Sequence, residues 1–196
     1  MLRLRLPRGL IGALFAVLLV ASPAHGSIVQ ALGLEELVEH ADRIVLGRVL
    51  SSESFQLSDG ELGTWCRIQV ERDIGGAAPD ETEVIVETLG GRIGNLAMQV
   101  EGEPSFSVGE RVIVFVRGGG PYRAFRPVGM GQGVMRVRKE QGIETVTQSR
   151  RGMMLMRRGS DGHWQKSLGA LPEAEGLETF IERVRAIAEQ QAGGLQ

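Results

Sequence analysis

The chain has 196 residues, of which 42% are hydrophobic, 23% charged and 5% aromatic, and it contains 1 cysteine. This length and this apolar fraction predict one globular domain of ordinary size and exclude a disordered chain. The single cysteine excludes an internal disulfide framework and a cysteine-based zinc cluster, and the 3 histidines leave little material for a histidine-rich metal site. We therefore expect no resident metal and no cofactor.

Residues 1–26 have the pattern of a secretory signal peptide. Arginines stand at the start, the apolar run 10–21 follows, and small residues precede a predicted cut between Gly26 and Ser27. The alternative is an uncleaved anchor, but a helix as short as this run reaches about 18 Å, against roughly 30 Å of hydrocarbon. We predict that residues 27–196 are exported, to the periplasm or beyond the cell, with no transmembrane segment after cleavage.

The exported part begins with a predicted short helix. Leu34, Leu37 and Val38 recur at helical spacing, and two acidic residues, Glu35 and Glu36, stand near the start of this segment. Acidic side chains are favourable there because of the helix dipole.

Short strands separated by glycine-rich turns follow the helix. The predicted strands cover 43–50, 65–72, 81–89, 96–100, 110–116, 122–125, 133–138 and 143–147. Two of them, 43–50 and 110–116, are apolar on successive positions, which is typical of central strands. No helical pattern separates the strands, so the spacing favours an antiparallel barrel or sandwich over a βαβ fold.

Cys66 shares the alternation of the second strand with Ile68 and Val70. This position predicts a buried side chain that packs as a small hydrophobe. The alternative, a redox or nucleophilic thiol, has no nearby histidine or second cysteine to support it. Cys66 also lies far from the predicted cut, which argues against a lipid-anchored N-terminal cysteine.

The chain ends in a predicted amphipathic helix over about 176–190. Its apolar stripe contains Leu177, Phe180, Ile181 and Val184, and charged residues occupy the other positions. We expect this helix to pack on the strands. Residues 27–196 then form a single domain.

Charge is distributed unevenly along the exported part. Residues 27–116 carry a net −10, residues 117–158 a net +8, and residues 159–196 a net −3. One interpretation is a basic face for a protein or for an anionic glycan or lipid surface. The other is that basic strands lie beside acidic ones and their charges pair. Nucleic acid is not an expected partner, because the exported domain is net acidic.

Six arginines are the candidate partner-binding residues. The first two alternate with apolar residues as on a one-sided strand, and the other four flank the methionine-rich run 153–156, which suggests an interfacial or partner-binding hairpin. The six are Arg136, Arg138, Arg150, Arg151, Arg157 and Arg158.

Three further motifs suggest chemistry. Ser160-Asp161-Gly162-His163 has the residue types of a hydrolase triad, but four adjacent residues with Asp-Gly predict a hairpin turn. The glycine-rich stretch 129–133 leads into a strand, whereas a phosphate cradle needs a helix N-terminus. Met153, Met154 and Met156 offer thioethers for copper, or else form a strand packed under the C-terminal helix.

Two stretches carry a resemblance to known families. Residues 34–49 place Ala41-Asp42-Arg43 before a hydrophobic strand with a glycine, and residues 102–115 place Gly109-Glu110 before a strand that ends in Phe115. Both resemble a group of uncharacterised secreted bacterial β-barrel proteins, and their order is similar to the netrin-like domain of tissue inhibitors of metalloproteinases. The resemblance implies a mainly β, OB-like barrel with a short N-terminal helix and a C-terminal amphipathic helix packed on it.

The same resemblance departs at the N-terminus. In those inhibitors an N-terminal cysteine chelates the protease zinc and disulfides hold that edge, whereas the exported chain here begins Ser27-Ile28-Val29. Because no catalytic set converges in the sequence and residues 117–158 are basic, we prefer an exported, non-enzymatic module that binds a protein or anionic partner. The alternatives are an inhibitor or accessory chain of a secreted metalloprotease and a methionine-based copper-binding protein.

Overall fold

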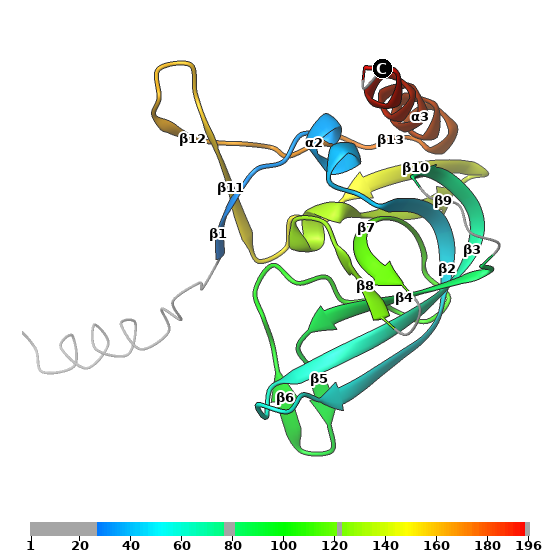
Figure 1. Cartoon of the computed structure of the whole chain (residues 1–196), viewed down its shortest axis with the longest axis vertical. Coiled ribbons are helices and arrows are strands. Elements are labelled where there is room, and N and C mark those ends of the chain that lie inside the picture. The colour runs from blue at the N-terminus through cyan, green and yellow to red at the C-terminus, as the bar shows by residue number, and fades with distance from the viewer. Residues whose placement is uncertain (1–26, 77–80, 121–122, 195–196) are drawn as a thin grey trace, which may run out of the picture.

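The computed structural model describes residues 27–76, 81–120 and 123–194, and the predicted signal peptide lies outside them. The protein is mainly β (Figure 1). Its helices are α2 (Leu34–Glu39), the 3-10 turn η1 (Met130–Gly133) and α3 (Leu177–Gly193). Its strands are β1 (Ser27–Gln30), β2 (Arg43–Gln56), β3 (Leu62–Gly76), β4 (Glu83–Leu89), β5 (Gly91–Ile93), β6 (Leu96–Met98), β7 (Arg111–Gly120), β8 (Arg123–Pro127), β9 (Val134–Glu140), β10 (Ile143–Gln148), β11 (Met153–Arg158), β12 (Trp164–Lys166) and β13 (Glu175–Gly176).

Five strands close into a ring in the order β7-β2-β3-β4-β8, because β8 pairs with both β4 and β7. Neighbours in this ring are antiparallel except β4 and β8, which run parallel. β9, β10 and β13 extend the sheet from β7. A five-stranded barrel of this kind is the OB-like architecture. The predicted fold class is therefore confirmed, with two parallel pairings, β4–β8 and β1–β11, that an all-antiparallel barrel does not include.

The interior consists of two hydrophobic clusters, one on each face of the central strands. Val45, Val112 and Val114 point into the barrel with Cys66 and Ile68. The alternate residues of the same strands point outward and pack under the two helices; they include Ile44, Leu46, Ile113 and Phe115. β2 and β7 thus bury both faces, which is why their sequences are apolar at successive positions.

β2 bends as it passes from one cluster to the other. Its pairing with β3 shifts register at Ile44/Val45, at Leu46/Gly47 and at Val49/Ser51. A Cβ at Gly47 would lie 2.4 Å from the backbone oxygen of Gln69, so only glycine allows this close approach of the two strands. Bulges and a glycine at a close crossing are the usual means of closing a small barrel.

The helices α2 and α3 cover the cluster that contains Ile44, Ile113 and Phe115, which we call the outer cluster. Phe180 is fully buried and meets Phe115 edge-on, with the ring centroids 6.5 Å apart. Arg72 on β3 donates to both carboxylate oxygens of Glu178, at 2.7 and 3.1 Å, and this hydrogen bonding lowers the pKa of Glu178. The predicted C-terminal helix and its packing on the strands are confirmed. No helix within the described ranges has the length and apolarity needed to cross a membrane.

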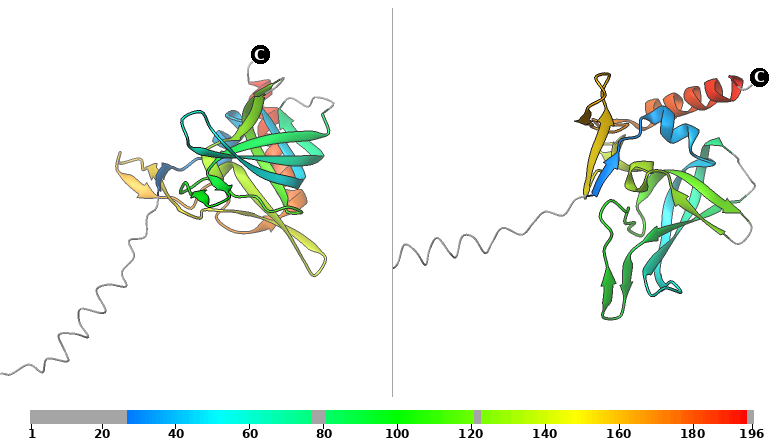
Figure 2. Two further views of the ribbon diagram at one scale, coloured as in Figure 1. Left: turned by 90° about the horizontal axis from the view of Figure 1, so that it is seen from below. Right: turned by 60° about the vertical axis from the view of Figure 1, so that its left-hand side comes forward.

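A second, smaller sheet projects from the barrel (Figures 1 and 2). β1 runs parallel to β11, and β11 forms an antiparallel hairpin with β12. The expectation that the methionine-rich strand lies under the C-terminal helix is wrong: α3 covers β3, β10, β13 and α2, whereas β11 pairs with β1. The strand at 27–30 was not expected at all, because its partner lies more than a hundred residues away.

Two buried glutamines hold the small sheet against the barrel. Gln132 is 0% exposed; its side chain accepts from Leu32 N–H at 2.9 Å and donates to the Gln30 carbonyl at 3.1 Å. Gln148 donates to the Gln132 carbonyl at 2.8 Å and accepts from Leu171 N–H at 3.2 Å. These hydrogen bonds give partners to backbone groups of Gln30, Leu32 and Leu171. Burying these polar groups without a partner would cost free energy.

Candidate functional site: an arginine-lined groove

A groove of about 1010 Å³ lies on the described surface. Its walls come from the ends of β2, β3 and β4, the β5–β6 hairpin, the loop 99–107, and the β9–β10 hairpin, which extends from the barrel (Figure 2). The lining is mostly polar, and its basic residues are Arg92, Arg136, Arg138 and Arg151. We call this feature the arginine groove.

Hydroxyl groups in the groove anchor its β5–β6 wall. Ser54 and Thr64 lie opposite each other on β2 and β3, with their oxygens 3.1 Å apart. Thr64 donates to the Gly90 carbonyl at 2.7 Å, and Ser54 accepts from Arg92 N–H at 3.0 Å. Gly91 allows this contact, since a Cβ there would lie 2.4 Å from Ser54 Oγ at a φ of 146°. The hairpin that carries Arg92 is thus fixed to the barrel.

The arginines of β9 have different environments. Arg136 is partly buried, pairs with Glu110, and donates to the Ser105 carbonyl at 2.7 Å. Arg138 lies two residues further along the same strand face and is exposed, as is Arg151. Within the described part of the chain, neither Arg138 nor Arg151 forms an ion pair. Arg136 is therefore a fixed wall residue whose charge is compensated, while Arg138 and Arg151 offer charge to a ligand.

Three glutamates also line the groove. Glu110 is held by Arg136 and accepts from Ser107 N–H at 3.2 Å, and Glu101 accepts from Gln99 at 2.8 Å. Glu103 accepts from Leu89 N–H at 3.2 Å. Burial raises the pKa of Glu103, against the opposing effects of that hydrogen bond and of Arg126. Each carboxylate thus has a donor within the protein, but only that of Glu110 is paired with a cation, so the lining keeps two carboxyl groups beside its exposed arginines.

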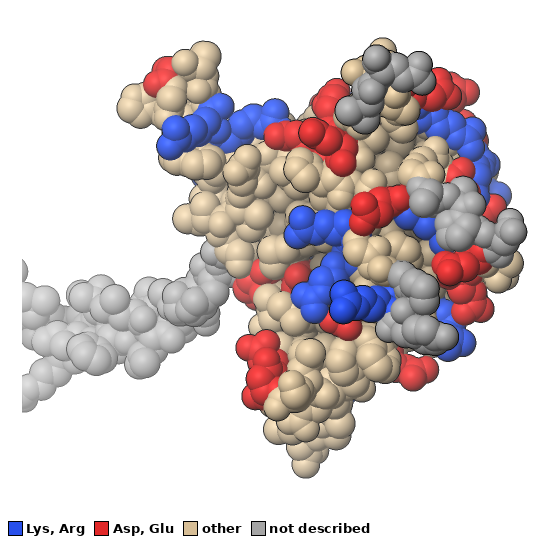
Figure 3. Space-filling view, in the orientation of Figure 1, with Lys and Arg blue, Asp and Glu red and all other residues tan. Residues whose placement is uncertain are grey.

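A smaller pocket of about 180 Å³ lies on the other side of Glu103. Arg126 pairs with Glu87 at 2.6 Å there, and Glu87 also accepts from the indole N–H of Trp65 at 3.0 Å. Arg117 completes the basic lining. Figure 3 shows the basic side chains gathered over β7 and β8, which carry these arginines.

The six arginines predicted from sequence do not share one surface. Arg136, Arg138 and Arg151 line the groove, and Arg150 donates to the Leu168 carbonyl at 2.8 Å. The remaining two lie on the hairpin of the small sheet, as described below. The charge-pairing alternative holds for three arginines of the basic stretch, which bind acidic residues of the preceding region in the pairs Arg126–Glu87, Arg136–Glu110 and Arg157–Glu36.

The motifs with possible catalytic or metal chemistry have structural roles. The stretch 160–163 forms the β11–β12 turn, in which Asp161 accepts from His163 N–H at 3.0 Å. The glycine-rich stretch 129–133 forms η1 and leads into β9, as predicted. Met153 and Met154 alternate across β11, so the three candidate copper ligands are divided between its two faces. No group of three His, Cys, Asp or Glu residues suited to a metal occurs among the described residues.

Sequence reasoning missed Arg92 and Glu103 as groove residues and Trp65 as an exposed aromatic that stacks on Phe55 with centroids 4.1 Å apart. The signal for Trp65 was its position next to the inward-pointing Cys66, because neighbouring residues of a strand point to opposite faces. In comparisons with known proteins, no protein-family model and no curated protein matches the chain.

Proposed function

We propose that the protein is an exported, non-enzymatic binding module whose arginine groove accepts an anionic segment of a partner. The observation that carries this proposal is the convergence of Arg92, Arg138 and Arg151 on one polar groove from three separate parts of the chain. Exposed basic side chains on low-dielectric walls concentrate anions, and the surrounding hydroxyl and backbone groups supply hydrogen bonds.

A non-enzymatic role fits the placement of the reactive side chains. His40 and His163 are exposed and contribute nothing to the groove lining. The thiol of Cys66 is buried in the barrel, and this burial raises its pKa to about 12. Neither these two histidines nor the cysteine reaches the groove, whereas binding needs only the fixed walls and exposed charges described above.

The test measures retention of the purified chain on immobilised polyglutamate, a soluble anionic polymer used as a probe. Arg138→Glu and Arg151→Glu are each expected to lower the salt concentration of elution, and the double variant to lower it most, because each change replaces attraction by repulsion. Arg185→Glu is the control: this exposed helix residue lies outside the groove lining, and its substitution changes net charge equally.

Equal loss of retention in the control and groove variants would show that net charge, and not the groove, governs binding. Retention that is unaffected by either groove substitution would also contradict the proposal. Circular dichroism and thermal unfolding of each variant exclude loss of structure as the cause.

A further inference from the structure

The small sheet has an outer face that combines apolar and basic side chains. Residues paired across neighbouring strands point to the same side, and the pairs here are Ile28 with Met154 and Arg158 with Trp164. Met154 and Arg158 share a face because they are separated by an even number of residues on β11. The outer face consists of Ile28, Gln30, Met154, Met156, Arg158, Trp164 and Lys166.

Packing determines which face points outward. On the opposite side of β11, Leu155 is only 3% exposed, and Arg157 binds Glu36 of α2 at 2.6 Å. On the outer face, Ile28 is 74%, Met154 44% and Trp164 52% exposed. Single exposed apolar residues are ordinary, but three on one small sheet form a patch.

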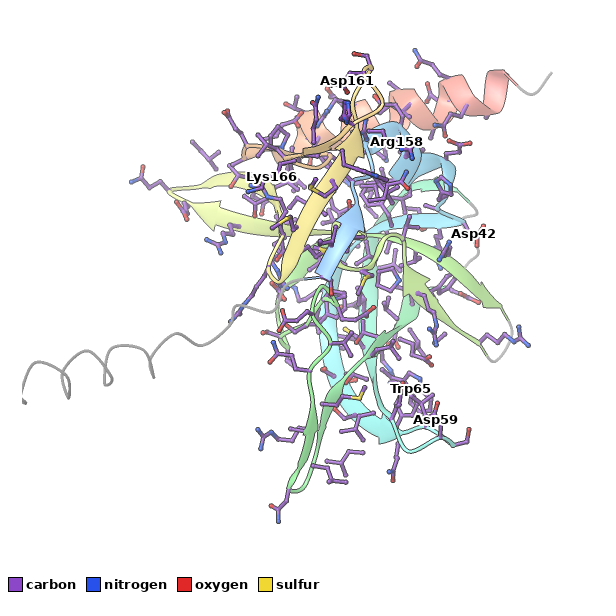
Figure 4. All side chains as sticks on the ribbon, turned by 90° about the vertical axis from the view of Figure 1, so that its left-hand side faces the viewer. Asp42, Asp59, Trp65, Arg158, Asp161 and Lys166 are labelled. Atoms are coloured by element: carbon purple, nitrogen blue, oxygen red, sulfur yellow. The ribbon has the colours of Figure 1, made fainter. Side chains whose placement is uncertain are left out.

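The outer face carries two basic side chains, Arg158 and Lys166, and no acidic one, in a domain whose residues 27–196 carry a net −5. Arg158 lies over the Trp164 ring, 5.5 Å from its centroid. Figure 4 shows Arg158 and Lys166 on the hairpin and Asp161 at its turn. Apolar and aromatic side chains flanked by Arg and Lys are typical of segments that lie at the headgroup level of a membrane.

We infer that the outer face docks the protein onto the surface of an anionic phospholipid bilayer. Ile28, Met154 and Trp164 enter the boundary between headgroups and acyl chains, while Arg158 and Lys166 bind phosphate groups. The β11–β12 hairpin projects beyond the barrel (Figures 1 and 2). None of the outer-face residues lines the arginine groove, so the two surfaces are separate.

The experiment is co-sedimentation with phosphatidylcholine vesicles that contain or lack phosphatidylglycerol. It uses the full chain and, in parallel, a chain that begins at Ser27, so that a contribution of residues 1–26 is separated. Binding is expected only with phosphatidylglycerol and is expected to weaken with salt. The sequence contains 2 tryptophans, Trp65 and Trp164, so in a Trp65→Phe background all tryptophan emission comes from Trp164. This emission is expected to shift to the blue on binding.

Variants test the assignment to the outer face. Arg158→Gln and Lys166→Gln are each expected to weaken binding about fivefold, the effect of one basic side chain at such a surface. Trp164→Ser is expected to remove most of the binding, measured by co-sedimentation. Val108→Ser is the apolar control, since Val108 is 69% exposed on a separate loop, and Arg185→Gln is the charge control.

Three outcomes would overturn the inference. The first is equal binding to vesicles with and without phosphatidylglycerol, or no binding to either. The second is unchanged binding in the outer-face variants. The third is self-association of the chain without vesicles that Trp164→Ser removes, which would assign the face to a second copy. Retention on polyglutamate is measured for the same variants and is expected to be unchanged, which separates this inference from the groove proposal.

Discussion

The barrel and the small sheet are both built from β-strands, but their packing differs. β2 and β7 bury both faces, one in the barrel and one under the helices. The small sheet buries one face and exposes Ile28, Met154 and Trp164 on the other. Apolar residues in the barrel therefore stabilise the fold, whereas those on the outer face stabilise it little and are available for binding. The difference shows that apolar content alone does not distinguish a buried face from an exposed one.

The largest expected effect is the difference in reactivity of the Cys66 thiol between the folded and the unfolded protein. Burial raises the pKa of Cys66 from 9.0 to about 12, so its thiolate fraction near neutral pH is about a thousandfold lower than that of a free cysteine. Alkylation of the folded protein is expected to be negligible and to become fast in denaturant, as mass spectrometry can measure. Rapid labelling under native conditions would mean that the barrel opens readily.

The same shift predicts alkaline sensitivity. Between pH 9 and 12 the unfolded thiol ionises while the folded one keeps its proton, so unfolding is favoured as pH rises through this range. Cys66→Ala should remove this contribution, and comparison of the two urea midpoints at increasing pH measures it.

Truncation of the outer cluster is the next largest effect. Phe180→Ala should cost about 3–5 kcal/mol of the free energy of unfolding, since it leaves a cavity at a fully buried site beside Phe115. Hydrogen exchange should quicken throughout the barrel. Leu155→Ala is the counterpart in the small sheet, and there we expect faster exchange mainly in β1, β11 and β12. Equal effects of both substitutions on all strands would show that the two regions unfold as one unit.

Removal of the glutamine link should affect the small sheet more than the barrel. Gln132→Ala leaves Leu32 N–H and the Gln30 carbonyl without their partner and is expected to cost about 1–3 kcal/mol. Gln30→Ala is the control, because the exposed side chain of Gln30 takes no part in this link. Its cost should stay within about 0.5 kcal/mol. Chemical denaturation measures both values.

The smallest expected effect on stability comes from the carboxyl group of Glu103. Because burial raises its pKa, the folded protein binds this proton more tightly than the unfolded chain, and stability falls as pH rises through the range of the shift. Glu103→Gln keeps an acceptor for Leu89 N–H and should raise stability at neutral pH by less than about 1 kcal/mol. The gain should vanish at acidic pH, where the wild-type carboxyl is protonated. A pH-independent gain would indicate improved packing in place of a titration effect.

Several features could be predicted from local pattern. Successive apolar residues identified β2 and β7 as central strands, alternation placed Cys66 inside, and helical spacing located α2 and α3. The OB-like order followed from the resemblance of residues 34–49 and 102–115 to known patterns, and membership of the netrin-like family stays a prediction. Of the six arginines that the sequence grouped together, Arg136, Arg138 and Arg151 line the groove and the others lie elsewhere, and their binding of a partner stays a prediction.

The sequence by itself determined the predicted elements and the uneven distribution of charge, since hydrophobic periodicity and composition are local properties. The tertiary structure alone decided that β1 pairs with β11, that Arg92 and Arg151 line one groove, and that Arg157 binds Glu36 of α2. These arrangements depend on contacts between distant segments, whose loop-closure cost is offset by the packing of the whole fold.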